Sequence, residues 1–241
     1  VRCLDHGRGQ RPADEQPEAR EKRQPRGRPP HAQPLSPAAR ISAAEVFALS
    51  DEMRTYLQSA EMQTELQNKG PQQGLFDALY QRARLQIIYD AEVTRNAGDT
   101  FRVRSGNCLS LVIMTSAFAK ALGVPVRYQS VSLPEQWRRL SGLYVGSTHV
   151  NLVLGSPENV TMNPESRRQL VIDFYPPEEL GKQRTRVLAE TTIVAMFMNN
   201  RAAESLLRGE LNDAYWWARE ALRQDPGFLV AANTLGVVYR R

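Results

Sequence analysis

Three residue types in this sequence can together form a nucleophilic site: a thiol, an imidazole and a carboxylate. Cys108 stands in "SGNCLSLVIMTSAF", where a polar turn meets a long apolar run. Of the three histidines, His6 and His31 lie in a Pro- and Arg-rich tail, so His149 is the only one in the predicted folded part. Asp173 lies in the apolar run "QLVIDFY", where an unpaired carboxylate is costly to bury. These types match the nucleophile, base and orienting group of a cysteine enzyme.

The helix start at Cys108 is not sufficient to make this thiol a nucleophile. The positive end of a helix dipole favours an anion by about 0.3–1 kcal/mol. An imidazolium about 4 Å away contributes on the order of 4 kcal/mol at an effective dielectric constant of about 20. A reactive Cys108 therefore needs His149, which lies on the predicted strand 148–154. If that strand pairs antiparallel with the predicted strand 169–175, Asp173 lies beside His149 and orients its ring.

Each of the three residues also has an ordinary structural explanation. A lone cysteine in an apolar helix is usually core, a strand histidine is more often structural than catalytic, and an aspartate at a strand end often caps a turn. All three nevertheless fall on elements that can bring them together, which favours a thiol site. One Cys and one His in the folded part are too few for a structural zinc site, and no glycine-rich phosphate loop occurs. We expect no metal and no organic cofactor.

The positive charge of the chain is concentrated near its start. Residues 1–40 contain nine Lys/Arg and five Asp/Glu, and the remaining 22 basic and 21 acidic residues contribute only +1 of the formal net charge of +5. The same segment holds seven of the 15 prolines, so we predict a disordered tail. The folded part has no basic excess for nucleic acid, and no stretch reaches the roughly 18 apolar residues of a membrane span. Localisation stays open: cytoplasmic, or cell envelope if a signal peptide preceded Val1.

Helices are predicted before and around the cysteine. Ser42 and Glu45 have the spacing of a capping box, and apolar residues from Val46 to Leu57 follow a single helical pattern. "GPQQG" at 70–74 breaks this pattern, and another helical stretch, "LFDALYQRARLQIIYD", follows it. The run after Cys108 is apolar nearly all round and predicts a helix buried inside the domain.

Strands are predicted after the buried helix, at 124–131, 148–154 and 169–175, with loops between them. The first of those loops is "SLPEQWRRLSG". The prediction for residues 41–190 is an α+β domain, with a central buried helix against an antiparallel sheet.

The segments "GNCLSLVIMTSAFAKALGVPVRYQ", "HVNLVL" and "VIDFYP" resemble the transglutaminase-like superfamily, over about residues 45–185. The resemblance implies a papain-like core, with Cys108 as nucleophile, His149 as general base and acid, and Asp173 as the orienting carboxylate. It also implies attack on an amide of a protein or peptide substrate through a thioester, ended by water in preference to an amine.

Two features differ from the common pattern of that family, and both border the expected cleft. "HVN" lacks the usual aromatic residue after the histidine, and the segment between His149 and Asp173 is longer than usual. We expect Asn107, Trp137 and Asn151 to line the cleft, and the backbone N–H of Cys108 is the first candidate for an oxyanion donor.

Residues 191–241 resemble a tetratricopeptide repeat. "GELNDAYWWAREALRQDPGFLVAANTLGVVY" has Gly209, Asp225-Pro226 and small residues where paired helices approach closely, at Ala214, Ala218 and Ala221. One repeat and a half is present, whereas at least three are usually needed for stability, so we expect either a truncated array or a piece that packs on the enzyme domain. A plain helical hairpin also fits. The resemblance implies a protein partner. A second reading of the whole chain is therefore a non-catalytic interaction scaffold in which Cys108 is packing.

Overall fold

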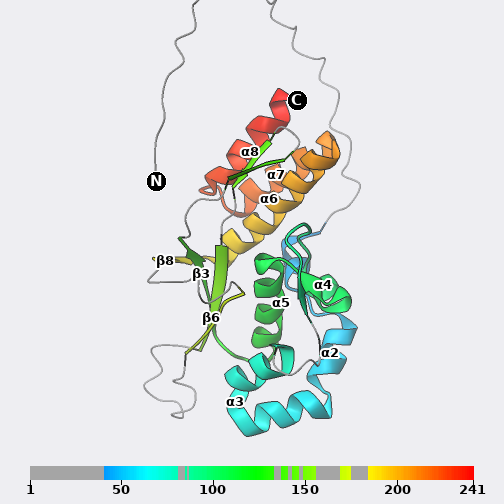
Figure 1. Ribbon diagram of the computed structural model, residues 1–241, viewed down its shortest axis with the longest axis vertical. Coiled ribbons are helices and arrows are strands. Elements are labelled where there is room, and N and C mark those ends of the chain that lie inside the picture. The colour runs from blue at the N-terminus through cyan, green and yellow to red at the C-terminus, as the bar shows by residue number, and fades with distance from the viewer. Residues whose placement is uncertain are drawn as a thin grey trace, which may run out of the picture. The chain divides into compact units, whose positions relative to one another are not determined.

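The described part of the computed structural model begins with helices (Figure 1). The structure describes residues 41–80, 85, 87–132, 137–140, 143–146, 149–155, 169–174 and 184–241, with 137–140 and 143–146 as backbone only. All of these belong to one unit, residues 35–241. The predicted disordered tail, residues 1–40, lies outside the described residues.

The helix predicted from Val46 to Leu57 is two helices, α1 (Ala43–Val46) and α2 (Asp51–Leu57). The expectation of a single helix was wrong because Ser50 begins a new one: its Oγ accepts a hydrogen bond from the Met53 N–H at 3.3 Å. One arm of the expected capping box is confirmed. The Ser42 N–H donates to Glu45 Oε2 at 2.7 Å.

The predicted break at "GPQQG" is a kink within α3 (Ala60–Tyr80). Gly70 has φ 76° and ψ 169°, a conformation that favours glycine, and Pro71 follows it. A Cβ on Gly74 would lie 2.6 Å from the backbone oxygen of Glu65, so this glycine allows the two halves of α3 to approach. Of the helix predicted over residues 75–90, α3 contains the part up to Tyr80, and residues 81–84 and 86 lie outside the described residues. The prediction was wrong for Ile88–Tyr89, which form a strand.

Two short strands precede the central helix. β1 (Ile88–Tyr89) and β2 (Ser105–Gly106) form a parallel pair that the sequence did not predict, and α4 (Ala97–Val103) lies between them in the chain. α5 (Cys108–Ala121) follows, and every residue from Leu109 to Ala119 is buried. The predicted central buried helix is confirmed.

The main sheet has the strand order β7-β6-β3-β8 and is antiparallel throughout. Its strands are β3 (Val126–Val131), β6 (His149–Leu154), β7 (Leu170–Ile172) and β8 (Thr185–Leu188). Helix α5 packs against β6, beside the sheet (Figure 1). The mixed helical and antiparallel-sheet class is therefore confirmed. β8 was not predicted, because it has four residues and is largely exposed.

The first predicted loop of the sheet region contains a hairpin instead. β4 (Trp137–Leu140) pairs antiparallel with β5 (Leu143–Gly146), so the expectation of an irregular loop was wrong. A tight hairpin satisfies its backbone groups locally without joining the main sheet, and the period-two pattern over four residues is too short to stand out in the sequence.

Three helices end the chain, as the helical pattern predicted: α6 (Glu190–Arg208), α7 (Leu211–Gln224) and α8 (Leu229–Arg240). Gly209 ends α6 with φ 81°, in the left-handed conformation that helix termini favour. The small residues expected at close approaches are fully buried, at Ala214, Ala218 and Ala221. Among the described helices, none combines the length and apolar character needed to cross a membrane.

Candidate active site

Cys108 is the first residue of α5, and Asn107 is its N-cap. Asn107 Oδ1 accepts hydrogen bonds from the Ser110 backbone N–H and from Ser110 Oγ, both at 2.9 Å. The thiol is free and partly buried. The backbone N–H groups of the first turn, including that of Cys108, have no carbonyl acceptor one turn earlier in the helix. They point out of the N-terminus of α5, which is the positive end of the helix dipole.

The turn before Cys108 is fixed by close packing. A Cβ on Gly106 would lie 2.6 Å from Ser110 Cβ and 3.3 Å from Thr100 Cγ2, so only glycine fits there without a shift of the helix start. On the other side, the Asp90 N–H donates to the Gly106 carbonyl at 3.0 Å. The "SGNC" segment thus places the thiol at a defined point of the fold.

His149 begins β6 at the centre of the sheet and is only 4% exposed. Its Nε2 lies 2.6 Å from Asp173 Oδ1. Asn151 Nδ2 donates to the other oxygen, Asp173 Oδ2, at 2.9 Å. The pairing of Leu152 with Ile172, continued by one residue, puts Asn151 opposite Asp173 and explains why both β6 side chains reach this carboxylate.

The thiol and the imidazole also interact. Burial acts to lower the pKa of His149, but hydrogen bonds to Asp173 and to Cys108, together with their negative charges, raise this pKa to about 9. Because Nε2 bonds to Asp173, the ring nitrogen left for the Cys108 side chain is Nδ1. The structure therefore brings Cys108, His149 and Asp173 into one chain of contacts. This is the arrangement expected if the strand of His149 pairs antiparallel with the strand before Asp173.

This arrangement can carry out proton transfer coupled to nucleophilic attack. A protonated His149 stabilises a thiolate at residue 108, and the same proton can pass to a leaving group. Asp173 fixes the ring orientation, and Asn151 fixes Asp173. Among the described residues, no group of three or more His, Cys, Asp or Glu side chains is placed to hold a metal ion.

The three residues expected to line the cleft differ in their surroundings. Asn151 contacts the site through Asp173. Asn107 is 8% exposed, and both ends of its amide are bonded within the protein, so it acts as a helix cap beside Cys108. Trp137 lies in β4, and its side chain lies outside the described residues.

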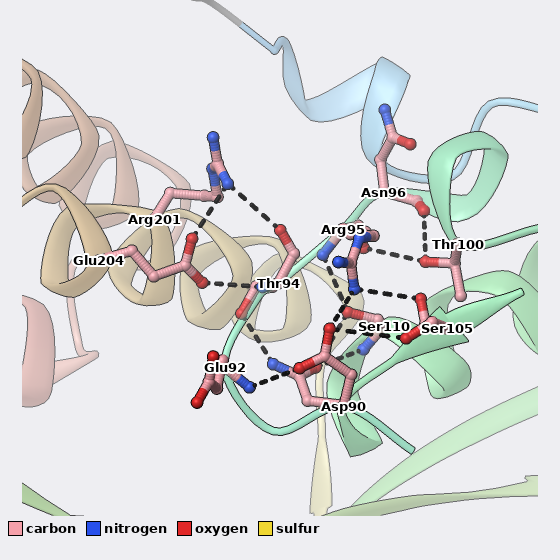
Figure 2. A network of polar contacts seen from close by, with 11 residues as sticks. Asp90, Glu92, Thr94, Arg95, Asn96, Thr100, Ser105, Ser110, Arg201 and Glu204 are labelled. Carbon is pink, nitrogen blue, oxygen red and sulfur yellow. Dashed lines mark hydrogen bonds and ion pairs between the residues drawn. The ribbon is translucent and has the colours of Figure 1, made fainter. Parts of the chain in front are cut away.

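A polar network behind the site was not anticipated from the sequence. Its centre is Thr94, which contacts Glu204 of α6 on one side, while the next residue, Arg95, contacts Ser110 of α5 (Figure 2). Asn107 also donates to Thr94 Oγ1, at 2.8 Å. An Asn directly before an apolar helix signals an N-cap. By contrast, nothing in the sequence links Thr94 to a residue 110 positions away.

Comparison of the chain with protein-family models, with curated proteins and with solved structures gives no match to any of them.

Proposed function

We propose that this protein is a transglutaminase-like cysteine enzyme that acts on amide bonds of protein or peptide substrates. Cys108 is the nucleophile, His149 the general base and acid, and Asp173 the orienting carboxylate. The observation that carries the proposal is the position of the His149 ring, in contact with the carboxylate of Asp173 and with the thiol of Cys108. A structural role for a buried histidine does not require a thiol at a helix start beside it.

The reaction proceeds in two halves. The Cys108 thiolate attacks the amide carbonyl carbon, and the carbonyl π electrons move to oxygen to give a tetrahedral oxyanion. Amide N–H groups at the start of α5 are suited to stabilise that charge. The His149 imidazolium donates its proton to the leaving nitrogen, the C–N bond breaks, and a thioester remains. Neutral His149 then removes a proton from water, which attacks the thioester and releases the acid and Cys108.

The motif resemblance supports the same assignment. A papain-like core needs a buried helix that begins with the nucleophile and packs on an antiparallel sheet carrying the base and its partner. The positions of Cys108 at the start of α5, His149 at the start of β6 and Asp173 directly after β7 support this assignment, and the three residue types are those of the family's Cys, His and Asp. Hydrolysis is favoured over transfer to an amine.

A second candidate function is protein interaction through α6, α7 and α8. The observation that favours it is the exposure of large apolar or aromatic side chains on α8: Leu229 is 77% exposed, Val230 49% and Tyr239 72%. In this reading Cys108 is packing and the helical region resembling a tetratricopeptide repeat carries the function. The two candidates differ in what they predict for the thiol.

The test is alkylation by iodoacetamide at pH 6 and pH 8, followed for Cys108 and Cys3 separately by peptide mass spectrometry. An ordinary exposed thiol slows by roughly 75-fold between these pH values as its thiolate fraction falls. Cys3, in the tail that the sequence predicts to be disordered, is the reference thiol within the same chain. We expect Cys108 to stay fast at pH 6 and to lose this advantage in His149→Ala. Parallel behaviour of Cys108 and Cys3, or no reaction of Cys108 in the folded protein, would contradict the enzyme and favour the interaction protein.

A further inference from the structure

Thr94 is held by helix α6 although it lies far from that helix in the sequence. It is 2% exposed, its N–H donates to Glu204 Oε1 at 2.8 Å, and its Oγ1 accepts from Asn200 Nδ2 at 3.1 Å. Arg201 Nη1 donates to the second oxygen of Glu204, Oε2, at 3.0 Å, which compensates the charge of this mostly buried carboxylate (Figure 2). Both the backbone and the side chain of Thr94 are therefore fixed by α6.

The same hydroxyl reaches the start of the helix that carries the thiol. Thr94 Oγ1 accepts from Asn107 Nδ2 at 2.8 Å, and Asn107 Oδ1 caps α5 through Ser110. One hydroxyl oxygen thus accepts from α6 and from the N-cap of α5. Because an amide side chain is rigid and planar, the position of its Nδ2 donor also sets that of its Oδ1 acceptor.

A second connection runs in parallel through the next residue. The Arg95 backbone N–H donates to Ser110 Oγ at 2.9 Å, and this hydroxyl in turn donates to Asn107 Oδ1 (Figure 2). Thr94 and Arg95 together hold the first turn of α5 from two sides. Ser110 is fully buried, so water cannot replace these bonds without a local opening.

We infer that helix α6 sets the position and reactivity of Cys108 through Thr94, so that Thr94 and Asn200 are positioning residues for the thiol site. The chemical part of this inference rests on the proposed function; the structural part, the coupling of α6 to the first turn of α5, does not. A partner that binds α6, α7 and α8 and shifts α6 would thereby change the reactivity of Cys108.

The test compares two threonine variants with the same chemical change. Thr94→Val removes the hydroxyl that joins Asn200 to Asn107. Thr192→Val is the control with the same chemical change, because Thr192 lies in α6 itself and its Oγ1 donates to Asp225 Oδ2 at 2.6 Å, away from α5. Two readouts are taken on the full chain: hydrogen exchange of the Ser110 amide by NMR, and the rate of Cys108 alkylation at pH 6 relative to Cys3.

We expect Thr94→Val to speed exchange of the Ser110 amide and to slow Cys108 alkylation, each by about tenfold, as for the loss of a buried hydrogen bond. Thr192→Val should change neither, and Thr94→Ser should restore both. Asn200→Leu, which keeps the Thr94–Asn107 bond and removes only the donor on α6, should give a smaller change in the same direction. Asn200→Leu also tests the coupling if the Thr94→Val protein does not fold.

The two proposals fail in different ways. If Cys108 tracks Cys3 in the unaltered protein, the proposed function fails, but the exchange of the Ser110 amide still tests the coupling. If Cys108 is activated, and Thr94→Val and Asn200→Leu leave both readouts as Thr192→Val does, the coupling is overturned while the enzyme stands.

Discussion

Asp173 is the residue whose surroundings decide how rigid the candidate site is. Both of its oxygens accept hydrogen bonds from β6, from His149 at 2.6 Å and from Asn151 at 2.9 Å. Asn151→Leu keeps the approximate volume and removes one donor. We expect a loss of about 1–3 kcal/mol in the free energy of unfolding, because the largely buried carboxylate of Asp173 loses one hydrogen bond. Urea denaturation measures the loss, and alkylation of Cys108 at pH 6 should slow with it.

The matched control is Asn199→Leu. Asn199 is a buried asparagine of α6, and its Oδ1, like that of Asn151, accepts no hydrogen bond among the described residues. This variant changes the same side chain away from Asp173 and should leave the alkylation rate of Cys108 unaltered. Equal rates in the two variants would mean that Asn151 does not position Asp173.

For single residues, the sequence predicted which side chains belong to the candidate site better than it predicted which atoms contact one another. The sequence singles out Cys108 and His149 as the one thiol and the one imidazole of the predicted folded part, and Asp173 as a carboxylate inside an apolar run; the geometry brings the three together. The role of Asn151 depends on strand register, which fixes what lies opposite residue 173. The alternation pattern identifies a strand but does not contain its register against a neighbour.

At the scale of the helix and the strand, some positions depend on a close approach that only glycine permits. Gly106 is such a glycine, two residues before the thiol of Cys108. Gly106→Ala would put a Cβ 2.6 Å from Ser110 Cβ, so the first turn of α5 must shift. We expect a loss of about 1–3 kcal/mol in the free energy of unfolding, as for overpacking in a core. Thermal or urea denaturation measures it.

Gly236→Ala is the control of opposite sign. Gly236 lies inside α8, and an added Cβ there meets nothing within 4 Å. Alanine in a helix interior is favoured over glycine by about 0.5–1 kcal/mol, so this variant should be more stable than the original protein. A Gly106→Ala protein as stable as the original would contradict the packing argument.

The elements with long, regular patterns were predicted and the short ones were not. The apolar run of α5 and the six-residue strands β3 and β6 have enough residues for their period to be recognised. The exception is β7, which has three residues but lies within the longer apolar run "QLVIDFY" that predicted it. β1, β2 and β8 have two to four residues, and Ser50 was overlooked as a helix start within a continuing apolar pattern. Such boundaries depend on caps and on pairing with distant strands, which a local pattern does not contain.

For the whole molecule, the unpredictable part is the set of contacts between distant segments. Thr94 and Asn200 are separated by 106 residues and Thr94 and Glu204 by 110. Each residue looks like an ordinary polar position in its own stretch of sequence. Only the packing of α6 beside α5 gives them a shared role, and that packing follows from the complete fold.

The same buried site makes the stability of the whole molecule depend on pH. In the folded state the pKa of His149 is raised from its ordinary value of 6.5 to about 9. Between these values the native state keeps a proton that the unfolded chain has lost, so folding is stabilised below pH 6.5 and this contribution disappears as the pH rises through the folded pKa. Stability should therefore fall across this window.

The measurement is urea denaturation at a series of pH values in the Cys108→Ser variant, which lacks the thiol. Asp173 then remains as the partner that raises the pKa of His149, and the window ends below pH 9. We expect a fall of about 1–2 kcal/mol, after solvent screening is allowed for. Adding Asp173→Asn should flatten the curve, because the carboxylate charge that holds the His149 proton is gone. The same slope with and without Asp173 would show that this carboxylate does not control the imidazole, and the proposed role of Asp173 would be lost.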